Sequence, residues 1–168
     1  MVGFTPHRYL PGPPFRYSTL SCGSALDLYS HKIVGWSMGS RMVAELPLAA
    51  LRMTFQQWHP APGLMHHSDR GSQYASKVYQ HALKGMRMTC SMSRKGDCWD
   101  NAVVESFFAS LKREECDGAA YPTRDIARQH VFAYLERFYN RKRRHSYLGY
   151  VSPAEFEAQH PASLRRIA

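Results

Sequence analysis

The spacing of apolar residues changes repeatedly between two periods along this chain, and this alternation constrains the fold more than any other feature. Residues 25–38 predict two strands joined by a tight turn at residues 30–32. A helix is predicted to begin near Pro47, because apolar residues then recur at every third or fourth position. A strand around residues 64–68, a helix capped by Ser76 and a strand at residues 86–92 follow. Strands that alternate with helices in this way predict an α/β domain.

Helical spacing dominates the second half of the chain. One helix is predicted from residue 101 to about residue 115, and a longer one from about residue 123 to residue 139. A final short helix begins with a capping box at residues 152–155. The polar stretch 93–100 contains a glycine and is predicted to be a loop.

Residues 1–24 show no sustained period, because prolines and glycines interrupt each candidate element. We expect an irregular or degenerate segment there, a core at residues 25–160 and a tail at residues 161–168. No apolar run approaches the roughly 20 residues that span a bilayer. The opening residues also lack the apolar stretch of a signal peptide, so a soluble, cytoplasmic protein is expected.

Basic residues are concentrated toward the end of the chain. The net charge is +9, and residues 121–168 contain nine basic side chains against four acidic ones. A polyanionic partner would explain this excess, although many basic proteins simply present solvated cationic surfaces. The four cysteines, at positions 22, 90, 98 and 116, form no pair with the usual zinc-ligand spacing. Free thiols are therefore expected, rather than disulfides or a zinc site formed with His66 and His67.

Two acidic residues are candidates for a catalytic metal site. Asp69 follows a predicted strand and enters a turn that contains Gly71. A metal-binding carboxylate fits this position, and so does an ordinary Asx turn. Glu105 lies one turn into an otherwise apolar helix, where it could face a metal or simply interact favourably with the helix dipole. The two residues are separated by 35 others.

Several basic side chains are candidates for contacts with DNA phosphates. Lys95 lies in the predicted loop before the Glu105 helix, and Lys112 lies two turns beyond Glu105 on the same side of that helix. A dense run follows the longest predicted helix and comprises Arg141, Lys142, Arg143, Arg144 and His145. A solvated helix end is the alternative for this run. Tyr139 and Tyr147 beside it are predicted to be packing residues rather than base stackers.

The motifs around Asp69 and Glu105 resemble those of insertion-sequence transposases that share the retroviral integrase core. The likeness extends over roughly residues 25–160. Its motifs are at residues 27–30, 33–36, 67–74, 91–96, 100–108, 138–149 and 152–153. The resemblance implies a ribonuclease-H-like mixed sheet flanked by helices, with a doubtful first strand in this chain.

The same resemblance implies polynucleotidyl transfer in DNA integration and recombination. In that family three acidic residues hold two Mg²⁺ or Mn²⁺ ions, and oxygen ligands suit these metals. Asp69 would be the second acid and Glu105 the third. The implied partners are the element's terminal DNA, target DNA, further copies of the chain and a helix-turn-helix companion portion.

The first acid of that triad has no counterpart here. The resemblance places it on the opening strand, yet residues 1–26 contain neither aspartate nor glutamate. Asp27 matches an aspartate of the family that is not catalytic. We therefore expect an N-terminally incomplete or degenerate copy with impaired strand transfer. A catalytically inactive DNA-binding remnant is the main alternative, and an RNA-binding basic domain ranks below it.

Overall fold

One mixed β-sheet organises the computed structural model of the chain, which describes residues 2–9, 20–41, 43–69, 71–92, 102–117, 119 and 121–160. Within these residues the strand order is β3-β2-β1-β4-β5. The strands are β1 (Val2–Tyr9), β2 (Leu20–Asp27), β3 (Ile33–Gly39), β4 (Met65–Ser68) and β5 (Thr89–Met92). The first three pair antiparallel, whereas β4 runs parallel to both β1 and β5. The expected α/β fold with a mixed sheet is confirmed.

The β1 strand corrects the expectation of irregular structure for residues 2–9 and of a doubtful first strand, whereas residues 10–19 lie outside the described part of the chain. It pairs with β2 along its whole length and with β4 from Val2 to Phe4. Because β4 ends at Ser68, Pro6 lies where β1 has a hydrogen-bonding neighbour on one side only. A proline, which cannot donate a backbone hydrogen bond, is tolerated at such an edge position.

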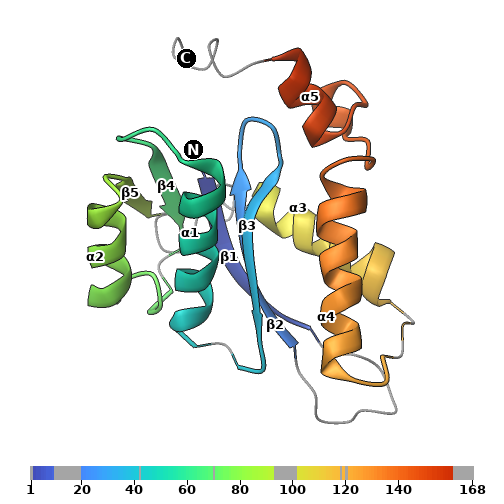
Figure 1. Ribbon diagram of the computed structural model, residues 1–168, viewed down its shortest axis with the longest axis horizontal. Coiled ribbons are helices and arrows are strands. Elements are labelled where there is room, and N and C mark those ends of the chain that lie inside the picture. The colour runs from blue at the N-terminus through green and yellow to red at the C-terminus, as the bar shows by residue number, and fades with distance from the viewer. Residues whose placement is uncertain are drawn as a thin grey trace.

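Helices cover both faces of this sheet. In Figure 1, α1 crosses in front of the sheet, α2 lies beside β5 and α4 lies on the β3 side. The helices are α1 (Glu45–Trp58), α2 (Lys77–Gly85), α3 (Ala102–Leu111), α4 (Arg124–Ala133) and α5 (Pro153–Gln159). The last turns of the two long predicted helices are π-helical, namely η2 (Lys112–Cys116) and η3 (Tyr134–Tyr139). A short 3₁₀ turn, η4 (Ser146–Leu148), precedes α5.

Local capping signals in the sequence are confirmed. The Ser76 hydroxyl accepts a hydrogen bond from the Tyr79 N–H at the start of α2. The Ser152 hydroxyl accepts one from the Glu155 N–H, and the Glu155 carboxylate accepts one from the Ser152 N–H. These bonds satisfy helix-terminal N–H groups that would otherwise lack partners.

Alternating side chains on β2 and β3 separate two hydrophobic cores. Leu26 and Ile33 pack with residues of α3, α4 and η3 on one face. Ala25 and Val34 pack with residues of α1 and α2 on the other face. Gly35 permits the close approach of α1, because an added Cβ would lie 2.5 Å from the Ala50 carbonyl oxygen. Within the described residues, no helix is long and apolar enough to cross a membrane.

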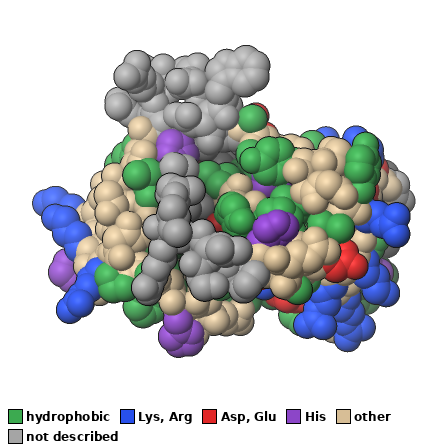
Figure 2. Space-filling model, turned by 90° about the horizontal axis from the view of Figure 1, so that it is seen from above, with side chains coloured by type: hydrophobic (Ala, Val, Ile, Leu, Met, Phe, Trp, Pro, Cys, Tyr) green, Lys and Arg blue, Asp and Glu red, His purple; other side chains and the backbone are tan. Residues whose placement is uncertain are grey.

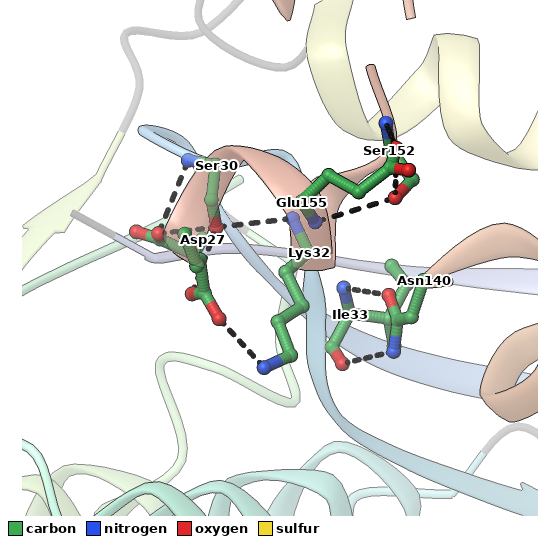
Figure 3. A network of polar contacts seen from close by, with 8 residues as sticks. Asp27, Ser30, Lys32, Ile33, Asn140, Ser152 and Glu155 are labelled. Atoms are coloured by element: carbon green, nitrogen blue, oxygen red, sulfur yellow. Dashed lines mark hydrogen bonds and ion pairs between the residues drawn. The ribbon is translucent and has the colours of Figure 1, made fainter. Parts of the chain in front are cut away.

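Polar contacts fasten the C-terminal helix to the β2–β3 turn (Figure 3). The buried Asp27 carboxylate accepts hydrogen bonds from the Ser30 N–H and hydroxyl at 3.2 and 2.7 Å, and Lys32 Nζ lies 2.7 Å from Glu157 Oε2. The Asn140 amide bonds both the N–H and the C=O of Ile33, at 2.9 and 3.0 Å. Asp27 therefore has a structural role in this turn.

Candidate active site and nucleic-acid interface

Asp69 directly follows β4 and is half-buried. Its Oδ1 accepts a hydrogen bond from the Gly71 N–H at 2.8 Å, so the Asx-turn interpretation describes its local geometry. A Cβ at position 71 would lie 2.8 Å from the same oxygen, which explains why glycine suits this turn. The turn fixes the backbone of Asp69 at the carboxyl end of β4.

Uncharged aromatic groups support the β4 strand that leads to Asp69. The buried His66 ring lies 2.9 Å from the Tyr79 hydroxyl, and burial lowers the pKa of His66 to about 4. Tyr74 is also buried beside both rings, and burial followed by the Asp69 charge raises its pKa. These side chains are therefore neutral near pH 7 and form a rigid base for the strand end.

Glu105 lies in the first turn of α3 and is exposed, whereas the opposite face of this helix is buried in the core. The α3 helix packs against β1, and β4 also pairs with β1. The elements that carry Asp69 and Glu105 thus both border β1. No interaction between the two carboxylates themselves is recorded among the described residues.

The β1 strand supplies no third carboxylate. Phe4 is in register with Ser68, so Thr5 and Asp69 are the residues that directly follow this last pair. No group of three or more His, Cys, Asp or Glu side chains that could hold a metal occurs in the part of the chain that the structure describes. The residues that the structure describes therefore do not fit the three-carboxylate metal site that the resemblance implies.

Exposed cations lie at several of the predicted DNA-binding positions. Lys112 is exposed at the beginning of η2, and Arg141, Lys142 and Arg144 are exposed after η3. In Figure 2 the Lys and Arg side chains gather toward the two ends of the long axis, and hydrophobic and His side chains lie between them. Lys95 lies outside the described residues.

Two members of the basic run are held inside the protein. Arg143 Nε lies 2.9 Å from Glu114 Oε2, and its Nη2 lies 2.8 Å from Glu114 Oε1 and 3.0 Å from the Ser110 hydroxyl. His145 is buried, and burial together with the Arg143 charge lowers its pKa to about 4. The sequence did not identify Glu114 and Ser110 as partners of Arg143, because they precede it by 29 and 33 residues.

The two tyrosines beside this run differ. Tyr139 is 3% exposed and packs edge-on against Phe107, so its predicted packing role is confirmed. Tyr147 is 75% exposed, and the prediction that it is a packing residue is wrong. Its ring stacks on His31, a contact across the β2–β3 turn that no local pattern reveals.

This arrangement of a mixed sheet, flanking helices and carboxylates after β4 and on α3 defines a ribonuclease-H-like fold. Two family models described as integrase core domain match residues 10–98 and 86–153. The chain belongs to the integrase core family. The HTLV-2 integrase catalytic core domain, solved in complex with magnesium, superimposes with a TM-score of 0.66 at 11% identity, covering 92% of this chain and 93% of that one. Likeness at this identity shows the fold alone.

Curated relatives are similar over most of this chain. The transposase for insertion sequence element IS904 of Lactococcus lactis is 46% identical over 144 residues, which cover 86% of this chain and 57% of the relative. Transposase InsF for insertion sequence IS3fB of Escherichia coli is 47% identical over 137 residues, covering 82% and 48%. The chain thus spans about half the length of these relatives.

Proposed function

We propose that this chain is the catalytic core of a DNA transposase, a polynucleotidyl transferase of DNA integration and recombination, whose carboxylate set is incomplete. One observation carries the proposal. The β1 strand borders the elements that carry Asp69 and Glu105, yet it contains no acidic residue. The family membership supports the reaction class, and the missing carboxylate supports impaired activity.

The implied metal is Mg²⁺ or Mn²⁺, because oxygen-only carboxylate ligands suit these ions. Asp69 and Glu105 are the proposed catalytic and metal-binding residues. Two carboxylates neutralise less of the positive charge of Mg²⁺ or Mn²⁺ than three would, so we expect this chain to bind these metals weakly. Loss of one ligand is expected to reduce strand transfer by orders of magnitude.

DNA is the proposed partner, both as the ends of the element and as the target. Lys95, Lys112, Arg141, Lys142 and Arg144 are the proposed phosphate contacts, and binding of this kind is salt-sensitive and nearly independent of sequence. Arg143 and His145 support the same segment from inside the protein. We further propose that copies of the chain associate on DNA in the cytoplasm, and that a helix-turn-helix portion supplies recognition of the element's ends.

A strand-transfer assay tests this function. The 168-residue chain would be incubated with Mn²⁺, pre-cleaved element ends and a supercoiled target plasmid, and joined products would be measured. We expect DNA binding together with a low yield of product that Glu105→Gln and Asp69→Asn abolish. Asp125→Asn, which removes an exposed carboxylate on α4, is the matched control and should leave the yield unchanged.

An inactive DNA-binding remnant is the second candidate, and the acid-free β1 strand favours it directly. Retarded DNA without any joined product would identify the remnant. A product that persists in Glu105→Gln would contradict both assignments, because neither allows strand transfer without that carboxylate. Preference for RNA over duplex DNA would instead favour an RNA-binding domain.

A further inference from the structure

The rings of His31 and Tyr147 form a stacked pair on the surface. Their centroids are 4.6 Å apart and their planes differ by 2°. Tyr147 remains 75% exposed, although an aromatic ring of this size usually buries much of its area. Burial lowers the pKa of His31 despite the opposing charge of Asp27, which favours the neutral imidazole in this stack. The pair therefore presents an exposed aromatic surface.

The loop that carries Tyr147 is held rigidly. His145 and Val151 form an isolated antiparallel bridge, and the Tyr150 N–H donates a hydrogen bond to the His145 carbonyl oxygen at 2.9 Å. Tyr150 adopts a φ of +63°, which is uncommon for a non-glycine residue. Strained backbone of this kind persists where the surrounding structure enforces it, and it is enriched at ligand-binding sites. Tyr147 is thus preorganised.

Positive charge lies immediately before this loop in the sequence. Arg141, Lys142 and Arg144 are exposed, and among the described residues none of them lies within ion-pair distance of a carboxylate. Exposed aromatic rings next to exposed cations match the chemistry of single-stranded nucleic acid, whose bases stack while its phosphates bind cations. In an interface between copies of the protein, these three like charges would have no phosphates to bind.

A cavity lies between His31, one member of the stacked pair, and the helix of Glu105. It has a volume of about 230 Å³ and lies between His31, Arg143 and the α3 residues Val103 and Ser106. Ser106 follows Glu105 directly, so the cavity adjoins the turn that carries the carboxylate.

We propose that the His31–Tyr147 pair is a stacking platform for an unpaired base of the DNA bound at this site. The inference rests on the proposed DNA-binding function and deepens it, since duplex binding alone requires no exposed stacking surface. The platform would hold a frayed or single-stranded nucleotide beside the Glu105 helix. Stacking of one base corresponds to about 5- to 150-fold in affinity.

Fluorescence anisotropy with two labelled DNAs tests the platform. One probe is a blunt duplex, and the other is the same duplex with an unpaired overhang containing 2-aminopurine. The native chain is expected to bind the overhang at least about fivefold more tightly and to quench the 2-aminopurine. Tyr147→Ala should remove both effects, Tyr147→Phe should retain them, and duplex binding should change less than twofold. Phe132→Ala, which removes an exposed ring on α4, is the control and should have no effect.

The outcomes separate this inference from the proposed function. Duplex binding without any preference for the overhang would overturn the platform and leave the DNA-binding function intact. Absence of binding to either probe would count against both. A Tyr147→Ala variant that keeps the overhang preference, or whose main change is loss of self-association measured by light scattering, would also overturn the platform. Thermal unfolding checks that each variant is folded.

Discussion

The guanidinium of Arg143 binds both carboxylate oxygens of Glu114, with N–O distances of 2.8 to 3.0 Å. Glu114 lies in η2 and also accepts a hydrogen bond from the Tyr134 hydroxyl in η3 at 2.8 Å. This carboxylate therefore joins the two π-helical turns. Arg143 belongs to the basic run, but its side chain stabilises the protein from inside. Its neighbours in the run face solvent.

Glu114→Gln is expected to lower the free energy of unfolding by about 1–3 kcal/mol, because it breaks charge-assisted bonds to a half-buried guanidinium. Urea denaturation measures the change. Asp125→Asn breaks an exposed ion pair with Arg128 and should cost less than about 1 kcal/mol. Equal losses in the two variants would contradict the structural role assigned to Glu114.

Stability is expected to fall as the pH decreases from about 6.5 toward 4. Burial lowers the pKa of His66 from 6.5 to about 4, so the unfolded chain binds a proton in this range while the folded chain does not. His66 alone should contribute about 3 kcal/mol to this loss. His66→Gln should flatten the pH dependence measured by urea denaturation. The exposed His81→Gln should leave it unchanged, and an identical flattening there would argue against burial as the cause.

Gly35→Ala is expected to destabilise the fold by about 1–3 kcal/mol, because the new methyl group would force α1 away from β3. Gly85→Ala is a useful control, since an added Cβ there meets nothing within 4 Å. That substitution should be neutral or stabilise by up to about 1 kcal/mol. Thermal denaturation compares the two, and a harmless Gly35→Ala would show that α1 does not approach β3 so closely.

Replacing Arg141, Lys142 and Arg144 together by alanine is expected to weaken DNA binding. The slope of log affinity against log salt should decrease in magnitude by about 3, one for each lost phosphate contact. Titrations at several salt concentrations measure it. Replacing Arg124 and Arg128 on α4 together with Arg137 on η3 removes the same charge and should reduce the slope less. Equal effects would mean that net charge, rather than this surface, determines binding.

Local signals in the sequence predicted most of the helices. Ser76 and Ser152 could be recognised as caps because each bonds a backbone group three residues away. The β1 strand could not be predicted, since β2 and β4 stabilise it from distant parts of the sequence. Asp69 and Glu105 were recognisable from their flanking motifs. The Arg143–Glu114 pair and the exposure of Tyr147 depend on tertiary contacts that no local pattern encodes.

The β1 strand lacks the carboxylate that would complete the set formed by Asp69 and Glu105. Thr5 and Asp69 each follow the last paired residues, Phe4 and Ser68, so Thr5→Asp introduces an acid at the β1 position nearest to Asp69 in sequence register.

Isothermal titration with Mn²⁺ tests this claim most directly. We predict weak binding by the native chain and an affinity at least about tenfold higher for Thr5→Asp, because even groups that support a metal ligand contribute about 10- to 100-fold. The gain should disappear in Thr5→Asp/Glu105→Gln and be absent from Thr5→Asn. Tight Mn²⁺ binding by the native chain that is lost in Asp69→Asn would contradict the claim, because the site would then be complete without an acid on β1.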